Sequence, residues 1–291
     1  MRVLIVGCGY VGLPLGTALA LQGHEVYGMR RSETGVNEMR AAGIKPVIGD
    51  ITRPKTLPNE RPSFDWVVNC VSAGASDAAV YRSVYLEGMH HLLSWLGVHP
   101  PLRLVYTSST GVYGQTDGSW VTETSATEPE AETARVLLAA EQVLLDTSPS
   151  NQVPGVVLRV AGIYGPGRGY WLRQLLSGQA RLEGRGERVL NMIHRDDVAG
   201  AVIAALQRGR PGQIYNAVDD QPVTQLELFQ GLSEHLKQPV PASVAEPTGA
   251  GRARGFTSKR ISNQKLKNEL GFRFKYPTFR EGFATLGGAE K

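Results

Sequence analysis

The stretch that most constrains the fold lies near the start of the sequence. Four apolar residues at positions 3–6 run into three glycines, Gly7, Gly9 and Gly12, in the spacing G-x-G-x-x-G, and apolar residues then recur at helical spacing over 13–20. This pattern predicts a strand, a tight turn and a helix. Gly7 permits the turn, Gly9 lets the backbone approach a pyrophosphate, and Gly12 lets the helix pack close to the strand.

Such a loop predicts a binding site for a dinucleotide. The phosphates would lie against free N–H groups at the positive end of the helix dipole. We therefore expect the whole loop to contact the ligand, through Gly7, Cys8, Gly9, Tyr10, Val11 and Gly12. The alternative is a glycine-rich turn that binds nothing.

The end of the second predicted strand, residues 25–29, bears on the choice of dinucleotide. NAD-binding units usually place an acidic residue there to hold the ribose 2′-hydroxyl. Here Met29 is followed by Arg30, Arg31 and Ser32. Arginines are well suited to bidentate contact with a phosphate. The pattern predicts NADP(H), with NAD as the second possibility, unless the two arginines are only solvated loop charges.

The ends of the next strands carry further candidates. Asp50 and Ile51 follow a predicted strand at 46–49 and suit an adenine, through an acceptor for the exocyclic amine and an apolar surface for the ring. Asp50 as a simple turn residue is the alternative. A fourth strand at 64–71 ends in small residues, which leave room for a flat ligand. We expect Val71, Ser72 and Ala73 to contact it.

Strands alternate with helices as far as a fifth strand at 102–106, which runs into Thr107. Helices are predicted at 33–42 and 78–96. Such alternation predicts a parallel sheet with helices on both faces. Ligands bind beyond the carboxyl ends of such strands, so the candidate residues are expected along one edge of one sheet.

Composition excludes several other classes of protein. The chain has 291 residues, 42% of them hydrophobic, and a net charge of +4, which is too diffuse to indicate a nucleic acid partner. No uninterrupted run of about 18 apolar residues is present to span a membrane, so we expect a cytoplasmic protein. Cys8 and Cys70 are the only cysteines and are expected to be reduced core thiols. No metal site is predicted.

From residue 105 onward the chain resembles a known family. Its segment VYTSSTGVYG at 105–114 is similar to the strand-five serine motif of the extended short-chain dehydrogenase/reductase superfamily, the NAD-dependent epimerase/dehydratases, which act mostly on nucleotide sugars. Three later segments also resemble the family. Residues 158–167 resemble its sixth strand with the cofactor-covering loop, residues 191–199 resemble the segment that re-enters the sheet domain, and residues 213–218 resemble its seventh strand. The resemblance covers nearly the whole chain.

This resemblance implies a Rossmann-type doubly wound parallel sheet and a smaller, discontinuous C-terminal substrate domain. The boundaries we expect are 1–167 with 191–218 for the dinucleotide-binding domain and 168–190 with 219–291 for the substrate-binding domain. The aligned motifs make Ser109 the active-site hydroxyl and place Thr107 and Tyr164 at the cofactor. Thr224 and Glu227 have the spacing of a capping box at the start of a helix.

The sequence departs from the family in its catalytic pair. Family members use a tyrosine to transfer the proton of the substrate hydroxyl and a lysine four residues later to lower the pKa of that tyrosine. Here the corresponding positions on the helix at 132–142 hold Thr133 and Leu137, and residues 115–154 contain neither tyrosine nor lysine. The first loop also differs from the family's usual G-x-x-G-x-x-G. The chain is therefore identified as an atypical member of the superfamily.

Other phenols are candidates for the missing acid. Tyr113 follows Ser109 closely, Tyr85 lies on a helix that borders the expected pocket, and Tyr164 lies on the loop over the cofactor. A structural role is the alternative for each. We select Ser109, Tyr113 and Tyr85 as catalytic candidates.

Basic residues provide candidates for a substrate diphosphate. In the family, basic residues of the C-terminal region bind the diphosphate of a nucleotide sugar. Residues 252–275 hold eight basic residues and one acid, Glu269. The candidates are Arg168, Arg173, Arg254, Lys259 and Arg260. A solvated basic helix face is the alternative.

Two functional hypotheses follow. The first is an NADP(H)-dependent oxidoreductase or epimerase acting on a nucleotide sugar or a small carbonyl compound, with a displaced phenol as the acid. The second is a catalytically inactive dinucleotide-binding sensor or interaction module. Family members often dimerise through the helices that here contain Tyr85 and Leu137, so a homodimer is possible.

Overall fold

The structure is a computed structural model, and it describes residues 1–291 except 76, 98, 148–152, 245–255 and 287–291. Seven parallel strands form its central sheet in the order β12-β7-β5-β4-β1-β2-β3. They are β1 (Arg2–Val6), β2 (Glu25–Arg30), β3 (Ile44–Ile48), β4 (Trp66–Asn69), β5 (Arg103–Ser109), β7 (Gly155–Val160) and β12 (Ile214–Ala217). The side chains of β1 from Val3 to Val6 are buried, as expected for a strand covered on both faces.

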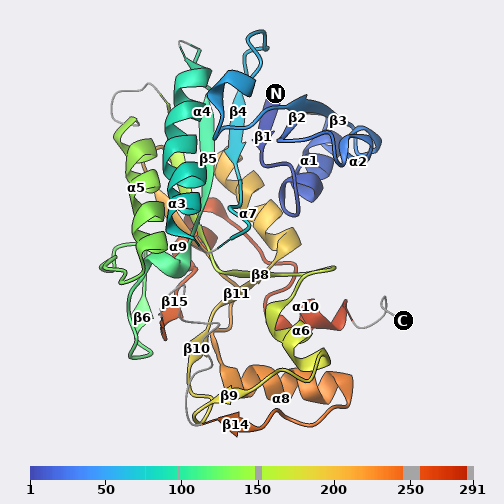
Figure 1. Cartoon of the computed structure of the whole chain (residues 1–291). Coiled ribbons are helices and arrows are strands. Elements are labelled where there is room, and N and C mark those ends of the chain that lie inside the picture. Colours follow the sequence, from blue (N-terminus) through green and yellow to red (C-terminus); the bar gives the residue numbers. More distant parts are fainter. Residues whose placement is uncertain (76, 98, 148–152, 245–255, 287–291) are drawn as a thin grey trace.

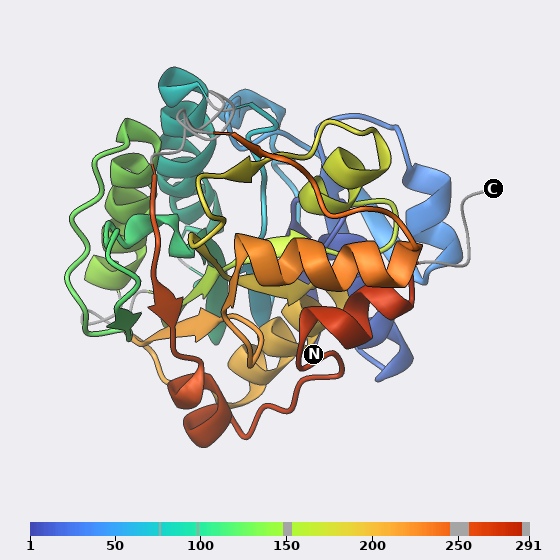
Figure 2. The same cartoon turned by 90° about the horizontal axis from the view of Figure 1, so that it is seen from below.

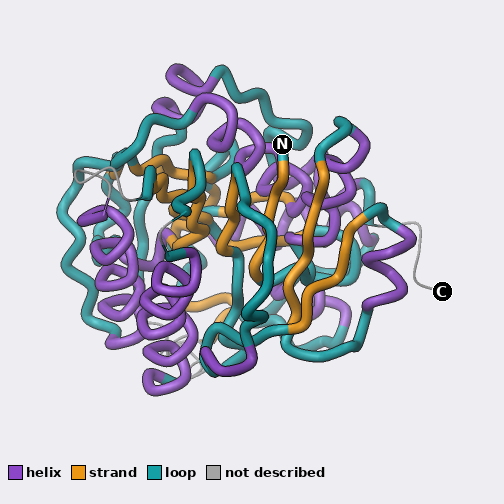
Figure 3. The backbone as a smooth tube through the Cα atoms, turned by 90° about the horizontal axis from the view of Figure 1, so that it is seen from above, coloured by secondary structure: helices purple, strands orange, loops and turns teal. Residues whose placement is uncertain are grey.

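Helices cover both faces of this sheet (Figures 1 and 3). On one face lie α1 (Gly12–Leu21), α2 (Val36–Ala41), α7 (Arg195–Arg208) and α9 (Gln264–Leu270). On the other lie α3 (Ala78–Tyr81), the π-helical segment η2 (Arg82–Glu87), α4 (Gly88–Leu96) and α5 (Glu132–Thr147). The predicted doubly wound α/β fold is confirmed.

A smaller lobe lies beyond one end of the sheet, at the bottom of Figure 1 and facing the viewer in Figure 2. It contains α6 (Tyr170–Leu176), β9 (Leu182–Glu183), β10 (Val189–Leu190), β13 (Val223–Thr224), α8 (Gln225–Leu236), β14 (Ser243–Val244) and α10 (Phe279–Ala284). Its core is built around Phe229 and Phe279, which are both buried. The predicted capping box starts α8, where Thr224 and Glu227 bond reciprocally.

Short paired strands connect the two lobes. β8 (Gly162–Tyr164) pairs in parallel with β11 (Met192–His194), so the chain leaves and re-enters the sheet region side by side. β6 (Trp120–Val121) pairs with β15 (Arg260–Ile261). The remaining elements are two short 3-10 helices, η1 (Pro54–Thr56) and η3 (Thr110–Val112).

One C-terminal segment packs away from the smaller lobe. α9 contacts α7 and β12, and its Leu266 and Leu270 belong to the core under the central sheet, together with Phe272. The expected substrate-binding residues 219–291 are therefore divided between two cores in the structure. The two-domain boundaries remain a prediction.

Candidate functional site

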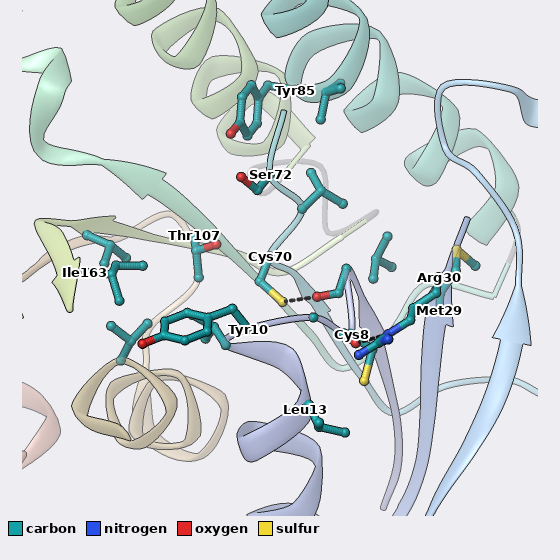
Figure 4. Close-up of a pocket in the computed structure, with 18 of the residues that line it drawn as sticks. Cys8, Tyr10, Leu13, Met29, Arg30, Cys70, Ser72, Tyr85, Thr107 and Ile163 are labelled. Atoms are coloured by element: carbon teal, nitrogen blue, oxygen red, sulfur yellow. Dashed lines mark hydrogen bonds between the residues drawn. The ribbon is translucent and has the colours of Figure 1, made fainter. Parts of the chain in front are cut away.

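A cavity of about 840 Å³ opens at the carboxyl ends of β1, β2, β4 and β5 (Figure 4). Its volume lies in the range of ordinary ligand sites. The structure brings most of the predicted residues together there, although they come from separate parts of the sequence. The predicted residues that line the cavity are Gly7, Cys8, Gly9, Tyr10, Val11, Met29, Arg30, Arg31, Ser32, Asp50, Ile51, Val71, Ser72, Tyr85, Thr107 and Ser109.

The glycine loop has the geometry that its sequence predicts. Gly7 has φ +89°, and a Cβ there would lie 2.8 Å from the backbone carbonyl of Cys70. Gly12 does not line the cavity, and a Cβ on it would lie 2.6 Å from the carbonyl oxygen of Gly7. A Cβ on Gly9 would meet nothing closer than 3.9 Å. The loop is therefore tightly packed beneath Gly7 and Gly12 and open at Gly9, where a phosphate needs space.

The two adjacent arginines after β2 have different surroundings. The Arg30 guanidinium donates to the carbonyl oxygens of Cys8 at 2.5 Å and Thr34 at 2.9 Å, and it lies 4.0 Å from the Glu38 carboxylate. Arg30 therefore ties the end of β2 to the glycine loop. Arg31 and Ser32 are exposed and line the cavity, so they are the groups available to a 2′-phosphate.

Asp50 and Ile51, which were predicted to contact the adenine, both line the cavity. The Asp50 Oδ1 accepts hydrogen bonds from the amide of Thr52 at 2.9 Å and from its hydroxyl at 2.8 Å. Asp50 thus has the turn role that was its alternative, and its other carboxylate oxygen is not involved in these bonds. Ile51 is only 4% exposed.

Ser109 lies at the end of β5 and lines the cavity, where its Oγ accepts a hydrogen bond from the Gly111 amide at 3.1 Å. Leu137, at the position of the family's lysine, also lines the cavity. Thr133, at the position of the family's tyrosine, is buried and does not line it. The cavity wall is therefore apolar at Leu137, where the resemblance predicts that the family's lysine would stand.

Tyr85 reaches the cavity from the π-helical segment η2. Its hydroxyl oxygen accepts a hydrogen bond from the Ala73 amide at 3.2 Å, and its ring packs on Tyr81 with centroids 4.9 Å apart. Ala73 itself does not line the cavity. π-helical turns are rare and are frequent at functional sites. Figure 4 shows Tyr85 and Ser72 on one side of the cavity and Met29 and Arg30 on another.

Two predicted site tyrosines lie elsewhere. Tyr113 is completely buried and donates to the Asn216 Oδ1 at 2.8 Å, because the chain turns through η3 directly after Ser109. Tyr164 stacks on Phe283 with centroids 4.4 Å apart and donates to a carbonyl oxygen of the smaller lobe at 3.3 Å. Burial raises the pKa of both phenols. Neither lines the cavity, so the structure does not bring them to it as the sequence led us to expect.

A buried ionic network beside the cavity was not foreseen. The Glu141 carboxylate of α5 accepts from the Arg159 guanidinium at 2.7 Å and from the Ser108 hydroxyl at 2.5 Å. Arg159 and Glu141 are 4% and 2% exposed, and Ser108 lines the cavity. A sequence signal did exist, since Arg159 interrupts an otherwise apolar strand. A charge at such a position requires a buried partner.

The two cysteines are free thiols, as predicted. The Cys70 thiol donates to the Gly7 carbonyl oxygen at 3.4 Å. Burial raises the pKa of Cys8 to about 11 and also raises that of Cys70. Both side chains line the cavity in the protonated form, which is a poor nucleophile.

The basic residues predicted to hold a substrate diphosphate do not gather at the cavity. The Lys259 ammonium is buried and donates to the Tyr113 carbonyl oxygen at 2.6 Å, and Arg260 bonds the Gly118 carbonyl oxygen. Arg173 does not line the cavity, and Arg254 lies outside the described residues. Arg168 is the one member of this set that lines the cavity in the described part of the chain.

Two kinds of feature are absent from the residues that the structure describes. Within them, no helix is long and apolar enough to cross a membrane. No group of three or more His, Cys, Asp or Glu side chains in the same part of the chain is arranged to hold a metal ion.

The sequence profile of the NAD dependent epimerase/dehydratase family matches residues 3–217. The chain belongs to this family. A dinucleotide-binding epimerase/dehydratase fold is therefore established, and the cavity lies at the carboxyl ends of its parallel strands. Residues 105–114 carry the segment that resembles the serine motif, and that Thr133 and Leu137 stand in place of the catalytic pair remains a prediction.

Two relatives match almost the full length of this family member. Protein YeeZ of Escherichia coli is 28% identical over 95% of this chain and 96% of its own. The 3-diazoavenalumate denitrifying reductase of a Streptomyces species is 24% identical over 97% of this chain and 99% of its own. These names leave the substrate of this chain open.

Two solved structures have the same fold. A putative NAD-dependent epimerase/dehydratase from Methylobacillus flagellatus is 32% identical, with a TM-score of 0.79 over 99% of this chain and 98% of that one. The dTDP-glucose 4,6-dehydratase DesIV of Streptomyces venezuelae, solved with NAD bound, is 23% identical with a TM-score of 0.83 over 98% and 95%. The DesIV likeness supports the fold alone.

Proposed function

We propose that this protein is an NADP(H)-dependent oxidoreductase or epimerase that acts on a small carbonyl compound or a nucleotide sugar without the Tyr-x-x-x-Lys pair. One observation carries the proposal. A single cavity is lined both by the glycine loop with Arg31 and by Ser109 with Tyr85. The cofactor contacts and the groups able to handle a substrate therefore share one space.

The residues present fit a dinucleotide. The backbone at Gly9 is open to a phosphate, and the cavity volume of about 840 Å³ suits a large ligand. Arg31 and Ser32 at the end of β2 provide a cation and a hydroxyl where NAD-specific units have a carboxylate. These two residues support NADP(H) as the cofactor. NAD(H) is the alternative, since the DesIV structure holds NAD.

The chemistry proposed for the substrate end uses two hydroxyl groups. A bound reduced nicotinamide supplies a hydride for the carbonyl carbon. The Ser109 hydroxyl hydrogen-bonds and orients the carbonyl oxygen. The Tyr85 phenol gives its proton to that oxygen, and the Ala73 amide, which already bonds the phenolic oxygen at 3.2 Å, stabilises the negative charge left there.

The described residues favour a small carbonyl compound over a nucleotide sugar. Lys259 and Arg260, two of the predicted diphosphate ligands, are bonded to backbone carbonyl oxygens away from the cavity. The 3-diazoavenalumate denitrifying reductase, by its name a reductase of a diazo compound, is a relative that does not act on a nucleotide sugar. Nucleotide sugars remain part of the test because family enzymes such as dTDP-glucose 4,6-dehydratase use them.

The test is NADPH consumption with a panel of aldehydes and ketones, and product analysis with nucleotide sugars because epimerisation consumes no net NADPH, using wild type, Tyr85→Phe and Tyr81→Phe. Loss of a general acid costs about 10² to 10⁴ in rate. We expect Tyr85→Phe to lower kcat at least 100-fold while the Kd for NADPH stays the same. Tyr81→Phe is the matched control, a neighbouring phenol that also lines the cavity, and should keep wild-type rates. Full activity of Tyr85→Phe would remove Tyr85 from the mechanism.

A second function is favoured by one observation. Leu137 and Thr133 are chemically inert where the family has its acid and its cation. A dinucleotide-binding sensor or interaction module would bind NADPH with wild-type Ser109 and Tyr85 in place and turn over no member of the panel. This result would replace the enzymatic proposal by the sensor.

A further inference from the structure

We propose that Arg168 binds the diphosphate of the bound dinucleotide, closing over the glycine loop from the side of the smaller lobe. The inference rests on the proposed cofactor binding and extends it to a residue outside the Rossmann unit. Sequence reasoning placed Arg168 with the ligands of a substrate diphosphate. Its surroundings assign it to the cofactor.

Arg168 lies against the middle of the glycine loop. Its guanidinium carbon is 5.1 Å from the centroid of the Tyr10 ring, and that of Arg195 is 5.3 Å from the same ring. All three side chains line the cavity. Tyr10 follows Gly9, the residue at which the loop backbone is open to a phosphate. A guanidinium held over an aromatic ring keeps its N–H groups available for bonding to an anion.

A tight turn fixes the backbone of Arg168. The amide of Arg168 donates to the Gly165 carbonyl oxygen at 2.9 Å, and the amide of Gly165 donates to the Arg168 carbonyl oxygen at 2.8 Å. Gly167 within the turn has φ +68°. Gly165 packs directly on the loop, since a Cβ there would lie 2.9 Å from the Tyr10 hydroxyl. The turn is therefore packed against the glycine loop.

The two arginines at Tyr10 differ in charge pairing. Arg195 is held by the Asp196 carboxylate, with contacts of 3.0 and 2.9 Å, which neutralises its charge locally. Arg168 makes no ion pair within 4.0 Å with a carboxylate of the described residues, and its side chain is exposed. It therefore offers an unneutralised, bidentate donor at the place where two phosphates would lie.

A diphosphate has two sources here, the cofactor or a nucleotide sugar. We assign the cofactor's, because Tyr10 belongs to the loop whose backbone receives the cofactor's phosphates, whereas Ser109 and Tyr85 mark the substrate end. The two sources can be separated by measuring binding with ligands that differ in their phosphates.

The experiment is calorimetry on the full chain with wild type, Arg168→Ala, Arg168→Lys and the control Arg173→Ala. The ligands are NADPH, 2′-AMP, which has no diphosphate, and UDP-glucose added to protein saturated with NADP. We expect Arg168→Ala to weaken NADPH binding about tenfold or more, Arg168→Lys less, and Arg173→Ala not at all. Binding of 2′-AMP and UDP-glucose should not change with Arg168→Ala.

The other outcomes are also decisive. An NADPH Kd for Arg168→Ala within twofold of wild type overturns the inference. Weaker UDP-glucose binding with unchanged NADPH binding assigns Arg168 to the substrate and also overturns it. Failure of wild type to bind NADPH or NADH contradicts the proposed function itself, which is a separate result. Because Arg168 is exposed, its replacement should leave the protein folded, and a thermal melt checks this.

Discussion

Arg30 and Arg31 show how two identical neighbouring side chains acquire different roles. Arg30 donates to two backbone carbonyl oxygens and holds the glycine loop to β2. Arg31 is exposed at the rim of the same cavity. We therefore expect Arg31, and not Arg30, to contact the 2′-phosphate that distinguishes NADP(H) from NAD(H).

We predict that Arg31→Ala weakens NADPH binding about tenfold and leaves NADH binding unchanged, because it removes a charge-assisted contact to the 2′-phosphate. Arg30→Ala, the matched variant, should weaken both dinucleotides by a similar factor, because it releases the loop that both use. Titration calorimetry with the two reduced cofactors measures this. An unaltered NADPH-to-NADH ratio in Arg31→Ala would show that Arg31 does not read the phosphate.

His194 gives a prediction for pH. It is 1% exposed at the start of α7, where its Nδ1 accepts a hydrogen bond from the Asp196 amide, and burial lowers its pKa to about 4. In the unfolded chain the imidazole titrates near pH 6.5. Between these values the unfolded chain binds a proton that the folded chain does not, so the free energy of unfolding falls as the pH falls.

The contribution of His194 is about 1.4 kcal/mol per pH unit in the middle of this window. His194→Asn keeps an acceptor at the helix start and removes the titration. Urea denaturation from pH 7 to pH 4.5 should therefore show the variant gaining stability relative to wild type as the pH falls. Parallel stability curves for the two proteins would mean that His194 is not the titrating group.

At the scale of elements, the Glu141–Arg159 pair joins α5 to β7, and Ser108 adds β5. Glu141→Gln leaves the Arg159 charge buried without its counter-ion. Removing one partner of a buried pair typically costs about 3–5 kcal/mol, and we predict a loss of about that size in the free energy of unfolding. Glu141→Leu combined with Arg159→Met should recover part of it. Urea denaturation measures both, and a loss below about 1 kcal/mol for Glu141→Gln would contradict the prediction.

The sequence predicted the elements well and their side-chain partners less well. Strand and loop positions follow from apolar runs, glycine spacing and strand–helix alternation, which are local signals. Tyr85 and Tyr113 were both candidates, because Tyr113 follows Ser109 closely and Tyr85 lies on a helix that borders the expected pocket. A short turn, η3, directs Tyr113 toward Asn216, whereas a π-helical turn brings Tyr85 to the cavity. Such orientations depend on tertiary packing.

The positions of the basic side chains also depend on tertiary packing. A cluster of positive charge in sequence predicted a diphosphate site, yet Lys259 and Arg260 bond backbone carbonyl oxygens at the junction of the lobes. These contacts join residues more than 140 positions apart, so no local pattern could reveal them.

At the scale of the whole molecule, the two lobes contribute unequally to the cavity. The Rossmann unit supplies the glycine loop, the β2 end and the hydroxyl groups, while the segment that leaves it after β8 supplies Arg168. The family, the fold and the cavity are established. The proposed function therefore requires that this chain bind NADP(H) in that cavity.

The most direct measurement is titration calorimetry of the wild-type chain with NADPH and, separately, with NADH. We expect one molecule bound per chain, with a lower Kd for NADPH than for NADH because Arg31 and Ser32 meet the 2′-phosphate. Tighter binding of NADH, or no binding of either cofactor, would contradict this prediction.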